Sequence, residues 1–354
     1  MLGRARPFLR EKFLSVAAED YQQRQPQLLK MILTRCPVCA AELPPLSAKQ
    51  CSRCKTRYCG PACQKQHWEA GGHDKLCKLI KRGGGAEQYH ADTKYTKVVA
   101  VAAEACADDT KGQTCYICTQ AVHWKTKEGL VRGCSCRGTA GVAHVSCLAE
   151  QAKILYAEAE ENNLGVKVKN ERFSRWHACS LCEQGYHGVV RGALGWACWK
   201  TYVGRLETDW ARQMAINMLG NGLSTSSLHE DALSVREAEL SMLQRLGAPE
   251  QNILVALGNL ATTYETQGRL EQALRLRRDV YSGFLKLFGE ENIHTILNAN
   301  NYVLSLVNLQ RFEEAKALQR KTLPVTRRVC GENHEVTLKA RLVYGETLYR
   351  DPSA

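Results

Sequence analysis

Sixteen Cys and His residues fall into two sets of eight, and each set consists of four short pairs. The first set is Cys36-x2-Cys39, Cys51-x2-Cys54, Cys59-x3-Cys63 and His73-x3-Cys77. The second set is Cys115-x2-Cys118, Cys134-x-Cys136, His144-x2-Cys147 and Cys179-x2-Cys182. Zinc binds four thiolate or imidazole ligands in a tetrahedron, and a short pair presents two of them to one ion. The spacing therefore predicts two binuclear modules that bind four Zn²⁺ in total.

The other cysteines and the apolar runs bear on the cellular compartment. Cys106, Cys198 and Cys330 are the three of the 17 cysteines that lie outside the two sets. The N-terminal stretch has no continuous apolar core, so it is a poor export signal, and a disulfide framework is not expected. No stretch approaches the roughly 20 apolar residues of a membrane span. We therefore expect a reducing compartment, the cytoplasm or the nucleus.

The net charge of +12 suggests nucleic acid as a partner. That count treats every cysteine as neutral, whereas zinc-bound cysteines are thiolates. The thiolates of the two sets and four Zn²⁺ together lower the charge to about +6, which is common for a solvated surface. The sequence therefore does not favour a nucleic-acid partner.

The first set, in residues 36–77, resembles a MYND finger, with Tyr58 and Trp68 also at family positions. The resemblance implies an interleaved topology, in which one ion is held by Cys36, Cys39, Cys59 and Cys63. The other ion would be held by Cys51, Cys54, His73 and Cys77. The gap before His73 is longer than is common, so His67 is an alternative ligand. Protein fills every coordination position, which makes the zinc structural. The family implies a module that binds proteins, often Pro-containing peptides; a passive folding unit is the alternative.

The second set, in residues 115–182, has its ligands in the order of four cysteines, one histidine and three cysteines, and resembles a RING-CH finger. The seven residues between Cys136 and His144 fit that family better than the PHD finger, which is the alternative. The resemblance implies that Cys115, Cys118, His144 and Cys147 bind one ion. The second ion would be bound by Cys134, Cys136, Cys179 and Cys182. Helix formers and apolar spacing predict a helix over 148–162, between the two halves.

The RING-CH resemblance implies an activity without a catalytic nucleophile. Such a finger docks a ubiquitin-charged conjugating enzyme and orients its thioester, which is catalysis by proximity. Ile117, in the first zinc loop, is the candidate contact to that enzyme. Gln151 stands where the family usually has Trp, and Glu183 stands where active members often have a cation. These two differences favour the alternative, a non-enzymatic adaptor.

An aromatic segment and a repeat follow the second finger. Trp196 and Trp199 mark a connector that we expect to be a hydrophobic seam against the next domain. From about residue 207 the sequence matches itself at an offset of 42, as where Arg269 pairs with Arg311. A fainter upstream copy pairs Arg236 with Arg278 at the same offset. Each unit is predicted to be two helices joined by a short turn.

The repeat resembles tetratricopeptide repeats of the kinesin light chain type. The family implies stacked helix pairs that leave one face free to bind a partner peptide. A dimerisation or capping scaffold is the alternative role.

The predicted fold is mainly α-helical, with two small zinc-stabilised cross-brace α+β modules and a C-terminal α-solenoid. The predicted domains are an N-terminal segment of uncertain helical character (1–35), the MYND-type finger (36–77), a linker (78–114), the RING-CH-type finger (115–182), an aromatic connector (183–206) and the helical repeats (207–350). The predicted function is that of a soluble RING-CH-type ubiquitin ligase that selects its substrate through the MYND and repeat modules. The alternatives are a non-enzymatic adaptor and, less favoured, a PHD-like histone reader. All of these have proteins as partners.

Overall fold

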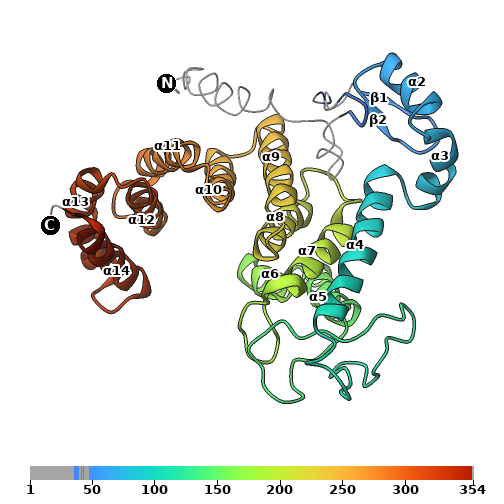
Figure 1. Cartoon of the computed structure of the whole chain (residues 1–354), viewed down its shortest axis with the longest axis horizontal. Coiled ribbons are helices and arrows are strands. Elements are labelled where there is room, and N and C mark those ends of the chain that lie inside the picture. The colour runs from blue at the N-terminus through green and yellow to red at the C-terminus, as the bar shows by residue number, and fades with distance from the viewer. Residues whose placement is uncertain (1–35, 40, 42, 44–47, 353–354) are drawn as a thin grey trace.

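The computed structural model describes residues 36–39, 41, 43 and 48–352 of the 354-residue chain, and most of them are helical (Figure 1). The N-terminal segment 1–35 lies outside the described residues. Within the described part, the strands are β1 (Lys49–Gln50) and β2 (Arg57–Tyr58), which pair antiparallel with Lys49 opposite Tyr58. The chain is therefore mainly α-helical, as the sequence predicts.

The first finger consists of this hairpin and two helices, α2 (Pro61–Glu69) and α3 (His73–Arg82). The extra glycines before His73 form the turn between the helices, and Gly72 has a left-handed φ of 69°. The buried residues of the finger form a small cluster of eight, of which four are cysteines. So few apolar side chains cannot stabilise a fold alone, which leaves that role to bound metal.

The segment expected as a linker, 78–114, is largely helical. After a turn at Gly83–Gly85, helix α4 (Ala86–Ala105) extends for 20 residues. Its buried residues Ala91, Tyr95, Val99 and Ala102 recur every three or four positions and pack against α7. Most of the apolar residues on this face are small, so the sequence indicated only weakly that the helix is packed.

The second finger is built on loops and on α5 (Val145–Glu161), α6 (Val166–Phe173) and a 3-10 turn, η2 (Ser174–Trp176). α5 corresponds to the helix expected over 148–162, but it begins three residues earlier and ends one residue earlier. α6 and η2 fill the rest of the long interval between Cys147 and Cys179.

The aromatic connector is the buried helix α7 (Gly188–Tyr202), in which Trp196, Trp199 and Tyr202 are all buried. It packs against α4, α5 and α8 (Trp210–Thr225), and α8 packs against α9 (His229–Arg245). One continuous hydrophobic core extends from Ala91 to Met242 through these helices. The second finger and the first helical pair therefore form one structural unit.

The solenoid continues with α10 (Glu250–Thr266), α11 (Leu270–Phe288), α12 (Ile293–Asn308), α13 (Phe312–Cys330) and α14 (Glu335–Arg350). Consecutive helices pack on one another, and the C-terminal helices lie at the far end of the molecule from the first finger (Figure 1). Asp351, directly after α14, is buried and forms an ion pair with Lys316 of α13 (2.7 Å).

The register of the first helical pair differs by one residue from the sequence expectation. Arg236 donates to the carbonyl of Asn217 and to the side chain of Asn221. Arg277 makes the matching bonds to Gly258 and Thr262. The structural offset is therefore 41 here, and Arg277, not Arg278, is the counterpart of Arg236.

Within the part of the chain that the structure describes, no helix combines the length and the hydropathy that crossing a membrane requires.

Candidate metal centres and the faces around them

The structure brings the sixteen ligand candidates together in four groups of four. In each group the ligand atoms all lie within 4.8 Å of one another. The groups are Cys36, Cys39, Cys59 and Cys63; Cys51, Cys54, His73 and Cys77; Cys115, Cys118, His144 and Cys147; and Cys134, Cys136, Cys179 and Cys182. This is the interleaved grouping that the two family resemblances imply.

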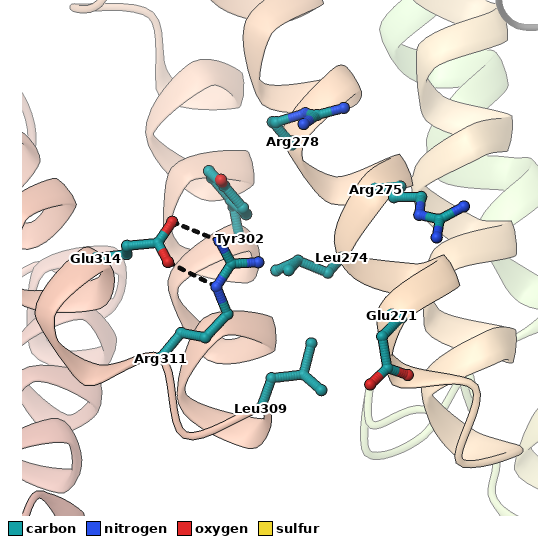
Figure 2. Close-up of a pocket in the computed structure, with 8 residues that line it drawn as sticks. All are labelled: Glu271, Leu274, Arg275, Arg278, Tyr302, Leu309, Arg311 and Glu314. Atoms are coloured by element: carbon teal, nitrogen blue, oxygen red, sulfur yellow. Dashed lines mark hydrogen bonds and ion pairs between the residues drawn. The ribbon is translucent and has the colours of Figure 1, made fainter.

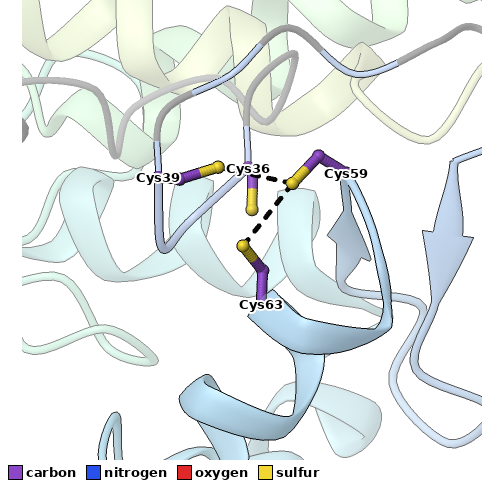
Figure 3. A group of neighbouring side chains, drawn as sticks. All are labelled: Cys36, Cys39, Cys59 and Cys63. Atoms are coloured by element: carbon purple, nitrogen blue, oxygen red, sulfur yellow. Dashed lines mark hydrogen bonds between the residues drawn. The ribbon is translucent and has the colours of Figure 1, made fainter.

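Figure 3 shows the first group, whose four cysteine side chains converge in the first finger. The Cys59 Sγ is 3.3 Å from the Cys39 Sγ and 3.5 Å from the Cys63 Sγ. Cys39 and Cys59 are exposed, whereas Cys36 is buried. Cys63 comes from the first turn of α2, so the helix start fixes one ligand.

The second group is buried throughout. The Cys51 Sγ lies 3.7 Å from the Cys77 Sγ, and the Cys54 Sγ lies 3.4 Å from the His73 Nε2. His67, the alternative ligand, is outside the group, and its Nδ1 lies 3.1 Å from the Tyr58 hydroxyl. The first turn of α3 holds His73, so the Gly71–Gly72 turn sets its position.

The third and fourth groups share the second finger. In the third, the His144 Nδ1 lies 3.3 Å from the Cys118 Sγ and 3.7 Å from the Cys147 Sγ. His144 is the residue before α5, so this helix start carries two of the four ligands. In the fourth, Gly141 has a φ of 76°, and a Cβ there would lie 2.8 Å from the Cys134 Sγ. A glycine is therefore required beside that sulfur.

Neighbouring thiols in a group do not ionise alike. Burial opposes ionisation of Cys36, but backbone N–H groups of residues 38, 39 and 59 outweigh it and lower its pKa to about 7. The pKa of Cys59 is raised, chiefly because its thiol shares hydrogen bonds with Cys39 and Cys63. Thiolates this close repel one another, so a full set ionises only around a cation.

The donor chemistry fits zinc at all four groups. Two groups offer four sulfur atoms, and two offer three sulfur atoms with one imidazole nitrogen. These sets are typical of structural Zn²⁺, and soft thiolates disfavour magnesium and calcium. Each group could therefore hold one metal ion through protein ligands alone.

The cysteines and histidines left over lie outside these groups. Cys106 is buried with its Sγ 3.6 Å from the Arg132 carbonyl oxygen. Cys198 lies inside α7, where burial raises its pKa. Burial, with Arg191 nearby, lowers the pKa of His177 to about 4. These residues serve packing.

The turn between Cys115 and Cys118 holds Ile117 at the surface. The Cys115 N–H donates to the Gln120 carbonyl (3.0 Å), and the Thr119 N–H donates to the Cys115 carbonyl (2.8 Å). The Ile117 N–H points at the Cys115 Sγ (3.4 Å). The Ile117 side chain is 37% exposed, in the position that the sequence suggests for a protein contact.

The Cys179–Cys182 turn repeats this geometry and presents Leu181. The Cys179 N–H donates to the Gln184 carbonyl (2.9 Å), and the Leu181 N–H points at the Cys179 Sγ (3.4 Å). Leu181 is 52% exposed. The sequence did not single out Leu181, although it is the third residue of its Cys-x2-Cys pair, as Ile117 is.

The two turns are tied to each other and to α5. The Tyr116 hydroxyl lies 3.2 Å from the Ser180 hydroxyl, which in turn donates to the Gln151 side chain of α5 (3.4 Å). Because Tyr116 and Ser180 immediately precede Ile117 and Leu181, the two turns that carry these exposed apolar residues lie side by side. Gln151, in the place where the family usually has Trp, thus accepts a hydrogen bond from the Cys179–Cys182 turn.

A groove of about 550 Å³ lies between α11, α12 and the start of α13 (Figure 2). In it, Arg311 forms a two-pronged ion pair with Glu314 (2.6 and 2.7 Å). The lining residues are Glu271, Leu274, Arg275, Arg278, Tyr302, Leu309, Arg311 and Glu314. Three arginines and two glutamates give this groove a slight positive charge.

Family models match three parts of the chain. The MYND finger model matches residues 36–77, the RING-variant domain model matches 115–182, and the tetratricopeptide repeat model matches 253–294 and 299–335. This chain contains a MYND finger, a RING-variant domain and tetratricopeptide repeats. The RING-CH finger is a RING-variant type, so the matches agree with the sequence expectation. The chain is thus a zinc-finger protein with protein-interaction domains.

Solved structures align with this chain at low identity. BtubC (BKLC) from P. vanneervenii aligns with a TM-score of 0.42 at 13% identity, over 59% of this chain and 85% of that one. A kinesin light chain candidate of Podosopora anserina, with nearly identical TPR-like repeats, aligns at 0.39 and 13% identity, over 59% and 89%. A singly substituted form of that protein aligns at 0.40 and 13% identity, over the same shares. No curated protein matches the chain.

Proposed function

We propose that this chain is a RING-type ubiquitin ligase whose RING-variant domain docks a ubiquitin-charged conjugating enzyme. The observation that carries the proposal is the pair of exposed apolar residues, Ile117 and Leu181, on two adjacent metal-binding turns. A few apolar side chains in a polar surrounding are the usual energetic centre of a protein interface.

The proposed mechanism uses position instead of a nucleophile. Zinc, when bound, supplies only the cross-links that fix the two turns. The Ile117 and Leu181 side chains would pack against the conjugating enzyme, while the hydrogen bond between Tyr116 and Ser180 joins the two turns and Gln151 ties the second turn to α5. Restricting the thioester to a reactive orientation accelerates transfer to a nearby amine without any acid or base from this chain.

Substrate selection is assigned in this proposal to the MYND finger and the repeats. The groove between α11 and α13 is open and slightly positive, which suits an acidic peptide segment of a substrate. The RING-variant domain and the first helical pair share one core, so a substrate bound on the solenoid would have a defined direction to the thioester.

The alternative is a non-enzymatic adaptor, and Glu183 is the observation that favours it. Glu183 follows the last ligand, is exposed and has a left-handed φ of 57°. An acid at this point would repel an acidic group that a cation would attract. In the adaptor alternative all three domains bind proteins and transfer nothing.

Reconstituted ubiquitin transfer tests the proposal. Zinc-loaded protein is incubated with activating enzyme, a panel of conjugating enzymes, ubiquitin and ATP. We expect ubiquitin chains to form, and we expect Ile117→Ala and Leu181→Ala each to slow chain formation by about tenfold, equivalent to about 1.4 kcal/mol of docking energy. Glu183→Arg should accelerate it if that position faces an acidic group.

Val166→Ala is the matched control, because Val166 is an exposed apolar residue of the same domain, on α6. It should transfer ubiquitin at the unmodified rate. Each variant is checked for bound zinc, so that a folding defect is not mistaken for lost docking. No transfer with any conjugating enzyme by a chain that retains its zinc would reject the ligase proposal and leave the adaptor.

A further inference from the structure

The outer face of α14 carries an apolar stripe that no other described part of the chain covers. Leu338 is 49% exposed, Leu342 is 72% exposed and Tyr349 is 91% exposed. With Gly345 they are spaced by three or four residues, which places them on one side of the helix. The opposite side, which includes the buried Ala340, packs on α12 and α13. The stripe therefore faces away from the solenoid.

In the part of the chain that the structure describes, no packing neighbour explains Gly345 in the middle of this stripe. Glycine destabilises a helix interior relative to alanine, so a glycine in a surface helix needs a reason. A Cβ added at Gly345 would meet no heavy atom within 4 Å. The missing side chain leaves room for another backbone or side chain to approach the helix closely at this point.

The charges along one edge of the stripe identify what approaches. Glu335, Lys339, Glu346 and Arg350 follow one another at helical spacing, with the signs negative, positive, negative, positive. They already pair within α14, Glu335 with Lys339 and Glu346 with Arg350. Read from the other end of the helix, the same order is positive, negative, positive, negative.

This pattern is complementary to itself. When two identical helices pack antiparallel about a two-fold axis, this edge of one helix lies beside the same edge of the other. The N-terminal half of each edge then faces the C-terminal half of the other. Glu335 then lies beside Arg350 of the second copy, and Lys339 lies beside Glu346 of the second copy. Opposite charges meet at every position.

We propose that α14 pairs antiparallel with α14 of a second copy of this chain. In this arrangement Leu342 of each copy packs against Gly345 of the other, and Leu338 packs against Tyr349 of the other. One helix per copy buries less than the about 1,600 Å² of a standard interface, so the dimer is reversible and depends on concentration. The inference goes beyond the proposed ligase activity and does not depend on it.

Sedimentation of the zinc-loaded full chain over a range of concentrations tests the dimer. We expect monomer at low concentration and dimer at high concentration. Leu342→Gln should raise the dissociation constant at least about tenfold, because it removes the most buried contact. Val255→Gln is the matched control, because Val255 is an exposed apolar residue of α10 and lies outside the stripe. It should leave the dissociation constant unchanged.

Gly345→Gln separates dimerisation from folding. Glutamine favours a helix more than glycine does, so the melting temperature of this variant should not fall. Its side chain would nevertheless fill the space meant for Leu342 of the second copy, and dimerisation should be lost. Loss of dimerisation together with a lower melting temperature would indicate damage to α14 and would count against the proposal.

A mixing experiment decides the orientation. Lys339→Glu alone and Glu346→Lys alone each place like charges opposite one another, so each variant should be monomeric. Mixed in equal amounts, the two variants face each other with opposite charges and should form a heterodimer. A folding defect would not be rescued by mixing. A chain that stays monomeric at every concentration, or a dimer that survives Leu342→Gln and Gly345→Gln, would overturn the proposal.

Discussion

At the scale of single residues, the four ligand groups differ in their access to solvent. The group that contains Cys39 and Cys59 is the one with exposed ligands, whereas all four ligands of the His73 group are buried. A chelator or an oxidant reaches a thiolate only where it is exposed. The two metal ions of the MYND finger should therefore be unequal in lability.

We predict that a chelator removes the ion of the Cys39 group first. Native mass spectrometry during treatment with a chelator should show a species with three zinc ions before any species with fewer. Cys39→Ser should speed loss of that first ion and leave the remaining three in place. Simultaneous release of all four ions would contradict this order, as would earlier loss from the His73 group.

The pH dependence of zinc binding is also a property of individual thiols. Burial and the neighbouring Cys51 thiol raise the pKa of Cys77 to about 12. Burial also opposes ionisation of Cys51, but the N–H of Cys54, the His73 ring and the N–H of Arg53 lower its pKa to about 6. Cys51 therefore loses its proton more readily than Cys77. Zinc binding must displace the proton of Cys77.

We predict that zinc affinity falls as the pH is lowered from 8 to 5, because protons compete for the thiolates. The zinc-dependent part of the free energy of unfolding should decrease in the same direction. Calorimetric zinc titrations in two buffers of different ionisation enthalpy should show net proton release at pH 7. Binding that is unchanged over this range would contradict thiolate ligation.

At the scale of helices, the contact between α7 and α8 depends on glycines. A Cβ at Gly222 would lie 2.7 Å from the Arg191 carbonyl oxygen and 3.2 Å from the Gly192 Cα. A Cβ at Gly195 would lie 3.1 Å from the Leu219 Cα. The two backbones are therefore close enough that a methyl group would force them apart.

We predict that Gly222→Ala lowers the free energy of unfolding by about 1–3 kcal/mol. Denaturant unfolding followed by circular dichroism measures this change. Zinc release from the RING-variant domain should begin at a lower denaturant concentration, because that domain shares the core. Gly258→Ala in α10 is the matched control, since a Cβ there meets only the Val280 side chain, at 3.9 Å. It should be neutral or stabilising by up to about 1 kcal/mol. Equal effects of the two substitutions would contradict the close helix contact.

The sequence predicted the features that are set by residues close to one another along the chain. Ligand pairs such as Cys115 and Cys118 are fixed by their spacing, and α5 is visible in its helix formers. The sequence did not predict the full length of α4 or its packing on α7, because the buried face of α4 consists largely of alanines and valines that have meaning only against α7. The importance of Leu181 likewise depends on a hydrogen bond between two turns that are far apart in the sequence. The one-residue shift at Arg236 is visible only in the bonds that this side chain makes.

At the scale of the whole molecule, the RING-variant domain and the start of the solenoid are not separate structural units. The core that extends from Ala91 to Met242 is reinforced by ion pairs between Arg205 and Glu160 (2.7 Å) and between Arg212 and Glu87 (2.9 Å). The MYND finger has its own small cluster of buried residues. Ala86 and Tyr89 at the start of α4 pack against this cluster, whereas the buried residues from Ala91 onward belong to the larger core. We therefore place the boundary between units of stability at the start of α4, near Gly85.

We predict that a fragment of residues 84–354 binds two zinc ions and keeps its helical content. A fragment of residues 207–354 exposes the buried face of α8, including Ile216, Leu219 and Leu223, and should aggregate or unfold. Light scattering, zinc analysis and circular dichroism of both fragments provide the measurement. A monomeric 207–354 fragment as stable as the longer one would contradict the shared core.

Because one buried helix joins the RING-variant domain to the solenoid, the distance between the zinc-binding turns and the first repeat helices is fixed. Under the proposed ligase function, a target would be modified at the lysine whose distance from the segment bound by the solenoid matches this fixed distance. The residues around that lysine would not matter. Moving a single acceptor lysine along an otherwise lysine-free target would then give a narrow peak of modification, where a flexibly tethered ligase would give a broad plateau.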